Sequence, residues 1–283
     1  NASIASMTTT AAVPVFDNGA GSYIRISGTQ HMEAVSSMPD WLAQMLHNLI
    51  LTGQCTDITL ELNDSLMTKV LDSGTVSTSP DFVLTGTCTT SFQTSGANRS
   101  NNIVVGASRL NNLIVMPGQT VSVSDTILPR TRANGYKEAG VYVNGAHTTG
   151  LGGGVCQISS TVYNAVKNAG LTVIQRNPHS MPVKYLPKGL DAAIAAGSKD
   201  LKFRNDYTTP VVLYTDTSNK HLTVNVLVWN QELAGRSFKL WAKQTGALSA
   251  DTYFTTYQNG KEVSTQFVGT SRYNPYREAV NDD

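Results

Sequence analysis

The sequence is poor in charged residues, which make up only 14% of its 283 positions. Its 21 Lys and Arg residues nearly cancel its 20 Asp and Glu residues, which leaves a formal net charge of +1. This balance excludes a protein that binds nucleic acid through its overall charge. Long apolar runs are also absent, since none approaches the roughly 18 residues that a membrane-spanning helix needs.

Cysteine is scarce as well, with only Cys55, Cys88 and Cys156 in the chain. Three distant cysteines exclude a disulfide scaffold, and no CxxC pair suggests a zinc site. At least one cysteine is therefore unpaired within the chain, and we expect Cys55 and Cys88 to be structural. A hydrophobic fraction of 40% is enough for a folded core, so the low charge does not indicate disorder.

The N-terminal residues Asn1 and Ala2 are interpreted as the remnant of a cleaved expression tag. The lack of a signal peptide or anchor in this sequence therefore carries no weight. Loops rich in Thr, Ser, Asn and Gly rather than Lys and Glu favour an extracytoplasmic bacterial protein.

Residues 23–62 predict a strand, a helix and a second strand, because their apolar spacing changes from two to about 3.6 residues and back. The stretch 72–80 is rich in Ser, Thr, Gly and Pro and indicates a domain boundary near residue 80. Residues 1–80 are thus expected to form a small α+β module. The remainder divides into a β-rich domain at 81–235 and a C-terminal β-hairpin extension at 236–283, in which Asn259-Gly260 is a strong hairpin signal.

The predicted class of the whole chain is α+β. Strands are expected at 82–92, 113–116, 120–124, 140–143, 171–175, 201–203, 211–214, 222–228, 254–257 and 262–268. One helix is expected to be capped by Asn98 or Ser100 and to place Ile103, Val104, Ala107 and Leu110 on its buried face. A second helix is predicted at 157–169 and ends at Gly170.

Cys156 is the strongest candidate for chemistry. The preceding glycines, Gly152, Gly153 and Gly154, allow backbone conformations closed to other residues and deliver the thiol to the first turn of a helix. The free N–H groups and the positive end of the helix dipole favour a thiolate there and could hold an oxyanion. The competing interpretation is a small, packed helix residue.

His179 is the preferred partner for this thiol, because it follows the strand after the cysteine helix and lies between Pro178 and Pro182. By itself it could equally be an ordinary loop residue. His147 lies closer in sequence, in what the pattern predicts to be a flexible loop. The remaining histidines, for which surface or packing roles are expected, are His31, His47 and His221.

Cys156, His179 and His147 match no zinc-ligand spacing, so neither a metal nor a cofactor is expected. Asp191 could orient His179, but the sequence favours a role as the cap of a short helix at 192–196. Arg130 either binds a carboxylate or lies in solvent.

Residues 89–205 resemble the VanW family. The motifs that carry the resemblance are Asn98-Arg99 with Asn102-Ile103, Leu110-Asn111, Pro117-Gly118, Pro129-Arg130-Thr131, Gly135-Tyr136, Gly152-Gly153-Gly154-Val155-Cys156-Gln157, Tyr163-Asn164-Ala165, Ala169-Gly170-Leu171, His179-Ser180, Tyr185, Gly189 with Asp191-Ala192, and Phe203-Arg204-Asn205. The tail at 257–275 is similar to the family's small β extension. Residues 23–62 resemble the peptidoglycan-binding module that often precedes a VanW domain.

The resemblance implies a Gram-positive envelope protein, exported and often anchored to the membrane or wall. Some VanW domains are reported to be L,D-transpeptidases, which join peptidoglycan stem peptides by 3-3 cross-links, with the cysteine of the GGGVCQ motif as nucleophile. That cysteine is Cys156 here. The VanW-like domain at 81–235 would then be catalytic, and the expected partners are peptidoglycan stems, with no nucleic acid and no second subunit.

On this hypothesis His179 is the base and Asp191 its orienting partner. Arg130 and Arg99 would bind stem carboxylates. The other residues expected at the substrate site are Gly152, Gly153, Gly154, Gln157, Ser180 and Tyr185. The competing hypotheses are a noncatalytic peptidoglycan-binding protein associated with glycopeptide resistance, a carboxypeptidase in which water replaces the acceptor amine, and a redox-sensing thiol.

Overall fold

A computed structural model describes residues 24–25, 61–62, 82–143, 146–195 and 197–276. In the N-terminal part, β1 (Ile24–Arg25) pairs antiparallel with β2 (Glu61–Leu62), and these strands lie within the two predicted there. The predicted helix between them, Cys55 and the boundary near residue 80 lie outside the described residues. No helix in the described part of the chain is both long and apolar enough to cross a membrane.

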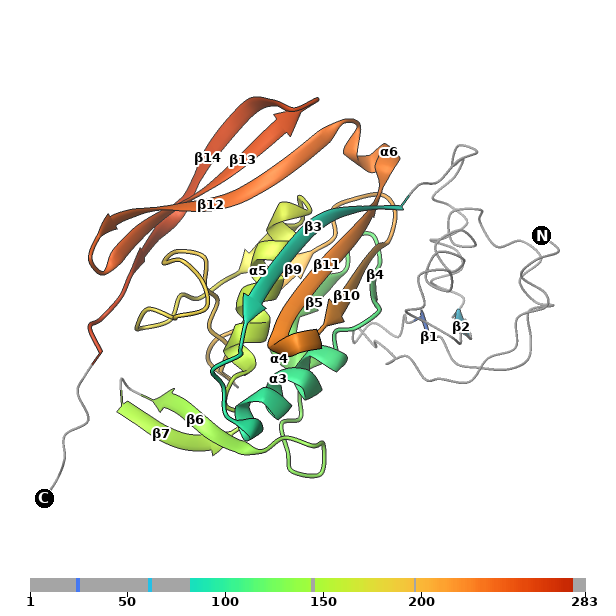
Figure 1. The fold of residues 1–283 in the computed structure, drawn as a ribbon. Helices are drawn as coiled ribbons and strands as arrows, with labels where there is room; N and C mark the ends of the chain where they lie inside the picture. Colours follow the sequence, from blue (N-terminus) through green and yellow to red (C-terminus); the bar gives the residue numbers. More distant parts are fainter. Residues whose placement is uncertain (1–23, 26–60, 63–81, 144–145, 196, 277–283) are drawn as a thin grey trace, which may run out of the picture.

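The centre of the molecule is an antiparallel sheet of four strands in the order β3-β11-β10-β4. These strands are β3 (Phe82–Ser91), β11 (His221–Trp229), β10 (Val211–Asp216) and β4 (Leu113–Val115). Helices α3 (Ala97–Ser108) and α5 (Val155–Asn168) contact this sheet and each other. Figure 1 shows α5 running behind β3, with α3 near one end of it.

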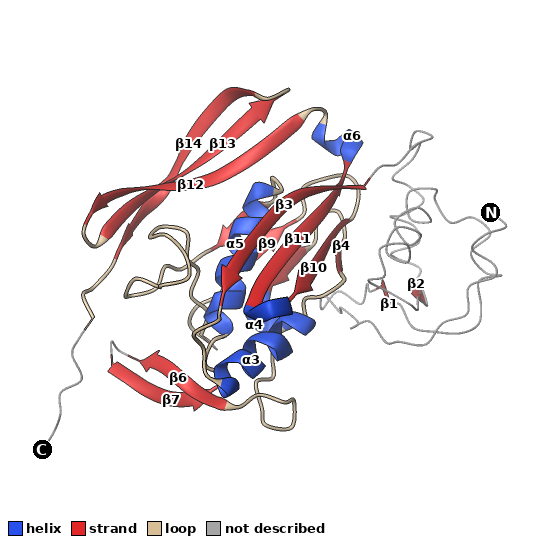
Figure 2. Ribbon diagram, viewed as in Figure 1, coloured by secondary structure: helices blue, strands red, loops and turns tan. Residues whose placement is uncertain are grey.

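Three smaller sheets surround this centre (Figure 2). The first has the order β5-β9-β8, the second is the hairpin β6-β7, and the third has the order β12-β13-β14. Their strands are β5 (Thr120–Ser122), β6 (Glu138–Val143), β7 (Ala146–Leu151), β8 (Thr172–Gln175), β9 (Lys202–Arg204), β12 (Arg236–Gly246), β13 (Ser249–Gln258) and β14 (Lys261–Arg272). The short helices are α4 (Val123–Thr126), α6 (Asn230–Leu233) and the 3-10 turn η2 (Ser218–Lys220). The described part is therefore β-rich and of mixed α+β class.

Helix α5 forms where the apolar spacing predicts it. The face it turns to the sheets carries Ile158, Val162 and Val166, all fully buried. Its end is also as predicted, because Gly170 follows with a φ of +81°, a conformation that favours glycine. The helix therefore has a fixed start and a fixed end within the hydrophobic core.

The predicted start of α3 is wrong. Its N-cap is Gly96, whereas Asn98 and Ser100 lie inside the helix. The Asn98 side chain instead donates to the carbonyl oxygen of Glu138 on β6. Val104 is 43% exposed, and buried Asn102 takes part in the inner face instead, where its amide bonds backbone groups of the neighbouring loop. Ile103, Ala107 and Leu110 are fully buried as predicted, so apolar spacing set the inner face and polar tertiary contacts set the start of the helix.

The strand expected at 120–124 ends two residues early. Ser122 caps α4 by accepting a hydrogen bond from the Asp125 N–H at 3.0 Å. The buried carboxylate of Asp200 accepts a bond from the Ser124 N–H at 3.0 Å. The alternation of apolar and polar residues therefore continues past the end of the strand. The chain turns into α4 there, because the Ser122 and Asp200 side chains accept the backbone N–H groups that a longer strand would pair.

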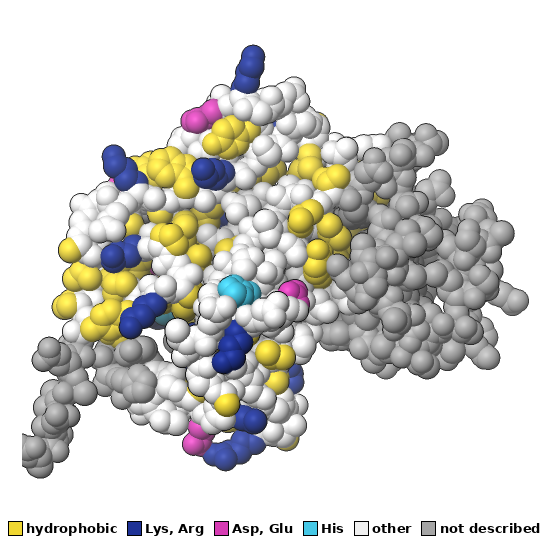
Figure 3. Space-filling model, viewed as in Figure 1, with side chains coloured by type: hydrophobic (Ala, Val, Ile, Leu, Met, Phe, Trp, Pro, Cys, Tyr) yellow, Lys and Arg dark blue, Asp and Glu magenta, His cyan; other side chains and the backbone are white. Residues whose placement is uncertain are grey.

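The C-terminal sheet contains one strand, β12, that was not predicted. The hairpin β13-β14 was predicted, and it turns at Asn259 and Gly260, whose φ angles are +50° and +76°. Across the sheet, Phe238 stacks on Phe254 with ring centroids 5.8 Å apart. Figure 3 shows hydrophobic side chains interspersed with Lys and Arg over this end of the molecule.

Candidate active site

Two structural requirements explain why glycine occupies positions 152–154, directly before α5. Gly152 and Gly154 have φ angles of +81° and +111°, which side chains rarely allow. Gly153 packs so closely on β6 that an added Cβ would lie 2.7 Å from the carbonyl oxygens of Ala139 and Gly140. The run therefore turns the chain sharply against β6 and places Cys156 as the second residue of α5.

Cys156 is a free, half-buried cysteine whose Sγ lies 3.3 Å from the carbonyl oxygen of Ile194. Burial raises the pKa of the thiol, but the neighbouring His179, as a donor and as a positive charge, outweighs burial and holds that pKa below its ordinary value. The positive charge of Arg130 acts in the same direction. The site therefore favours the thiolate more than an ordinary cysteine environment does.

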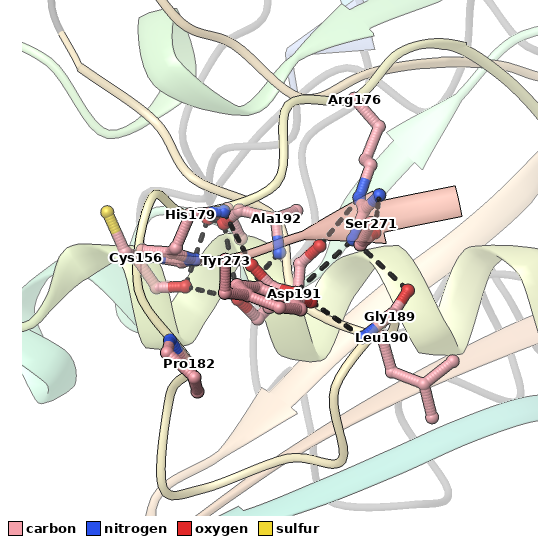
Figure 4. Close-up of polar contacts among 12 residues, drawn as sticks. Cys156, Arg176, His179, Pro182, Gly189, Leu190, Asp191, Ala192, Ser271 and Tyr273 are labelled. Carbon is pink, nitrogen blue, oxygen red and sulfur yellow. Dashed lines mark hydrogen bonds and ion pairs between the residues drawn. The ribbon is translucent and has the colours of Figure 1, made fainter. Parts of the chain in front are cut away.

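His179 lies between this thiol and Asp191 (Figure 4). Its Nδ1 is 2.7 Å from Asp191 Oδ2, which leaves Nε2 for the sulfur, and the same Oδ2 accepts a bond from the His179 backbone N–H. Burial lowers the pKa of the imidazole, but the hydrogen bonds to Asp191 and Cys156 outweigh it and raise the pKa to about 9. The imidazole is thus an imidazolium at neutral pH.

The predicted helix at 192–196 is not observed: residues 192–195 are not helical, and Asp191 caps nothing. Its carboxylate is fully buried and accepts bonds from His179, from the Tyr273 hydroxyl at 2.5 Å and from Arg176 Nη2 at 3.3 Å. Burial raises the pKa of Asp191, but these donors outweigh it and keep the pKa below its usual value. Asp191 therefore faces His179 as a carboxylate, which is the arrangement that a role in orienting His179 requires.

Cys156 and His179 open into a cavity of about 1540 Å³. The candidate site residues that line it are Arg99, Arg130, Gly152, Gly153, Gly154, Cys156, Gln157, His179, Ser180 and Tyr185, whereas Asp191 lies behind His179. Among the described residues, the lining also contains Lys184 and Lys199 but neither Asp nor Glu. The cavity is therefore electropositive and suits a ligand that carries carboxylates.

The two candidate arginines are held differently. Arg99 is bonded through its guanidinium to Ser95 and to Gln157 Oε1, so both of its terminal nitrogens already have a protein partner. Arg130 Nη1 is buried and has no hydrogen-bond partner among the described residues. Since a buried guanidinium donor is costly to leave unpaired, Arg130 is the better placed of the two to receive a carboxylate.

Gln157 and Tyr185 have protein partners within the cavity wall. Gln157 is buried, and besides accepting from Arg99 it donates to the Thr90 hydroxyl and the Ser91 carbonyl oxygen. The Tyr185 hydroxyl lies 3.3 Å from the Ser160 hydroxyl. These contacts fix the shape of the wall.

His147 does not lie in a loop as predicted. It belongs to β7, where its backbone pairs with Tyr142 of β6. Among the described residues, no group of three or more His, Cys, Asp and Glu side chains is placed to hold a metal ion.

Two residues at the site were missed by sequence reasoning, namely Arg176 and Tyr273. Arg176 donates to the backbone carbonyl oxygens of Gly189 and Asp191 as well as to the Asp191 carboxylate. Tyr273 is far from Asp191 in sequence and follows a hairpin with no chemical motif. Only the folded chain brings them together.

The order Cys156, His179 and buried Asp191, with His179 bonded to Asp191, resembles the arrangement of a nucleophile, a base and an orienting carboxylate in cysteine-based catalytic sites. Residues 98–227 match the family described as VanW like protein. The chain therefore carries a VanW-like domain at residues 98–227, as its motifs indicated.

Two curated relatives share this part of the chain. The uncharacterized protein YoaR of Bacillus subtilis is 41% identical over 128 residues, which cover 45% of this chain and 42% of the relative. The vancomycin B-type resistance protein VanW of Enterococcus faecalis is 37% identical over 116 residues, 38% of this chain and 42% of the relative. This chain thus spans less than half the length of either relative. No solved structure matches it significantly.

Proposed function

We propose that this protein is a cysteine L,D-transpeptidase that modifies peptidoglycan stem peptides in the cell envelope. The observation that carries the proposal is the placement of Cys156 at the start of a helix, beside His179 and its partner Asp191, in a cavity whose charged side chains among the described residues are positive. The VanW-like domain supports this assignment, since a relative with that domain is named a vancomycin resistance protein. Vancomycin resistance points to the cell wall as the place of action.

Acylation begins from a thiolate and an imidazolium. The Cys156 sulfur attacks the carbonyl carbon of the diaminopimelate–D-Ala bond in a tetrapeptide stem and forms a C–S bond. His179 then gives its Nε2 proton to the amide nitrogen as the C–N bond breaks. D-Ala leaves with that proton, and the stem remains as a thioester on Cys156.

The second half of the reaction uses the same imidazole as a base. The neutral His179 takes a proton from the side-chain amine of a second stem, which attacks the thioester carbonyl. A new amide bond forms as the C–S bond breaks, and the thiolate and imidazolium are restored. Asp191 stabilises the imidazolium in both half-reactions, and water in place of the amine gives carboxypeptidase chemistry.

The first turn of α5 supplies a donor for the oxyanion. The N–H groups of Val155 and Gln157 donate to the carbonyl oxygens of Gly152 and Gly154. The N–H of Cys156 lies between them and points out of the start of the helix, so it is the group we assign to the developing negative charge. Its position on the nucleophile itself keeps it close to the carbonyl under attack.

Arg130 is assigned to the carboxylate of the departing D-Ala, one residue beyond the scissile bond. Replacing it, Arg130→Gln, should lower kcat/KM for a tetrapeptide stem by about 10- to 100-fold, the loss of a charge-assisted hydrogen bond of ~1.5–3 kcal/mol. Steady-state release of D-Ala measures this. The matched control is Arg132→Gln, because Arg132 is exposed and, within the described part of the chain, pairs only with Glu138. Equal kinetics for the two variants would remove Arg130 from substrate binding.

Product analysis tests the proposed reaction directly. We would incubate the protein with disaccharide-tetrapeptide muropeptides and follow both products and intact protein by mass spectrometry. Disaccharide-tripeptide muropeptides, which lack the D-Ala leaving group, are the matched substrate control. A 3-3 dimer with loss of D-Ala, and an acyl adduct on the peptide containing Cys156, are expected with the tetrapeptide alone.

Other products would identify other functions. D-Ala loss from monomers without dimers would mean a carboxypeptidase that uses the same thioester. If neither product nor adduct forms while the folded protein still sediments with isolated cell walls, the transpeptidase proposal is wrong and the protein is a wall-binding module.

A further inference from the structure

The end of β14 and the segment that follows it reach the back of the candidate active site. Ser271 accepts a hydrogen bond from Arg176 Nη1 at 2.9 Å, and Tyr273 donates to Asp191 at 2.5 Å. The Asn274 N–H donates at 2.7 Å to the carbonyl oxygen of Ser180, the residue after His179. These contacts come from a part of the chain that lies beyond the VanW-like match at residues 98–227.

The direction of the Tyr273 hydrogen bond is fixed by its other partner. The Tyr273 oxygen accepts a bond from the Gly189 N–H at 2.7 Å, so its single proton is available for Asp191 Oδ1. Tyr273 is 6% exposed and Asp191 is completely buried, so water does not substitute readily for this donor. Burial and the neighbouring Asp191 raise the pKa of Tyr273 to about 12, which keeps the hydroxyl protonated at neutral pH.

The same loop is held from a second side by the C-terminal sheet. The Thr252 hydroxyl on β13 donates to the Gly189 carbonyl oxygen at 2.9 Å. Gly189 has a φ of +93°, and an added Cβ would lie 2.9 Å from the side chains of both Ala242 and Thr252. The loop that carries Asp191 is thus fitted closely against strands β12 and β13.

We propose that Tyr273 is a positioning residue of the active site, and that the catalytic unit therefore includes the C-terminal extension through residue 273. This rests on the proposed function of Cys156 and His179. Figure 4 shows Tyr273 and Asp191 side by side, with Arg176 and Ser271 on the side away from Cys156.

Tyr273 acts on the thiol through two intermediate groups. With Oδ1 held by Tyr273 and Arg176, Oδ2 of Asp191 faces both the ring and the backbone N–H of His179. Loss of the tyrosine donor leaves Oδ1 held by Arg176 alone, at 3.3 Å, so the carboxylate can turn away from the His179 ring. An imidazole without an aligned carboxylate holds its proton less firmly, and without the imidazolium the pKa of Cys156 rises.

The experiment compares the full chain with Tyr273→Phe and with Tyr257→Phe. Tyr257 lies on β13 of the same sheet, and its hydroxyl makes no hydrogen bond within the described part of the chain. Iodoacetamide labelling of Cys156 is followed from pH 3 to 9 by mass spectrometry of the peptide that contains it. Steady-state kcat and KM with tetrapeptide muropeptides are measured in parallel, together with the thermal midpoint.

For Tyr273→Phe we expect the labelling midpoint to move up by about one pH unit and kcat to fall about tenfold, since a hydrogen bond to a buried charge is lost. KM should change less than about twofold, because Tyr273 does not touch the substrate. Tyr257→Phe should match the wild type. An unchanged labelling midpoint in a folded Tyr273→Phe protein would overturn the positioning role.

Labelling separates this inference from the proposed function. If the wild type forms no product but its labelling midpoint still shifts on Tyr273→Phe, the transpeptidase assignment fails and the positioning role stands. If the wild type forms cross-links and Tyr273→Phe lowers kcat only in proportion to its unfolded fraction, the positioning role fails and the transpeptidase assignment stands.

Discussion

Replacing Cys156 with alanine is expected to abolish both the acyl adduct and the 3-3 dimer, with a fall in turnover of at least ~10³-fold. The thiol is the one group at the start of α5 able to form the proposed thioester, and no nearby side chain replaces it. Ser159 and Ser160 lie on the same helix, but their hydroxyls are buried and donate to backbone carbonyl oxygens. Product and intact-protein mass spectrometry measure this loss.

The fold should survive this substitution. Cys156 is half-buried and a thiol is a weak hydrogen-bond donor, so the thermal midpoint is expected to change by only a few degrees. Cys88→Ala is the matched control: burial raises the pKa of the Cys88 thiol to about 12, which makes it unreactive. Full turnover by a folded Cys156→Ala protein would be incompatible with a thioester mechanism.

Replacing His179 with alanine has the second large expected effect. Without the imidazolium, burial alone acts on Cys156, and the pKa of the thiol should rise from below its ordinary value to that of an ordinary thiol or higher. At pH 6 a thiol with a pKa near 9 is only about 0.1% ionised. A more basic thiolate is intrinsically more nucleophilic, so the alkylation rate at pH 6 should fall by about tenfold, which is less than the fall in the ionised fraction.

The pH dependence gives the sign of this effect. In the wild type, acylation needs the thiolate and the imidazolium together, so its rate should rise as pH passes the lowered pKa of Cys156. It should fall as pH passes about 9, where His179 loses its proton. Between these two pKa values the acylation rate should be level. In His179→Ala this level range should disappear, and the rate of Cys156 alkylation should keep rising toward alkaline pH.

The matched control for this variant is His221→Ala. His221 is the first residue of β11 and follows the turn η2. Among the described residues, its Nδ1 contacts only the backbone oxygen of Asn219. Alkylation of Cys156 should be unchanged in that protein. If His179→Ala alkylates at the wild-type rate at pH 6, His179 does not activate the thiol, and the cysteine and histidine act independently.

The local features of the fold were predictable where short-range chemistry decides them. Helix α5 and its glycine run, the strand β3 and the turn at Asn259-Gly260 all depend on spacing or on backbone conformations that few residues tolerate. The start of α3 and the end of β5 were predicted wrongly. At the start of α3, the Asn98 side chain bonds the carbonyl oxygen of Glu138 on β6 instead of capping the helix. At the end of β5, the Ser124 N–H bonds the distant Asp200 carboxylate.

The candidate site also contains residues that local sequence predicted and residues that only tertiary contacts decided. The glycine run marked Cys156, and the position of His179 after the next strand made it the preferred partner. For Asp191 the sequence favoured a helix cap over an orienting role, because a cap needs only neighbouring residues whereas an orienting carboxylate needs a histidine 12 residues away. The structure instead places that carboxylate against His179.

The sequence by itself determined the type of site: a cysteine delivered by glycines to a helix start, and the VanW-like motifs around it. The tertiary structure decided which residues complete it. Arg176 and Tyr273 reach Asp191 only when the C-terminal sheet packs against the core, and a buried carboxylate needs such donors wherever in the chain they originate. Short-range spacing specifies helices and turns, whereas the pairing of buried charges depends on contacts between distant segments that no local pattern records.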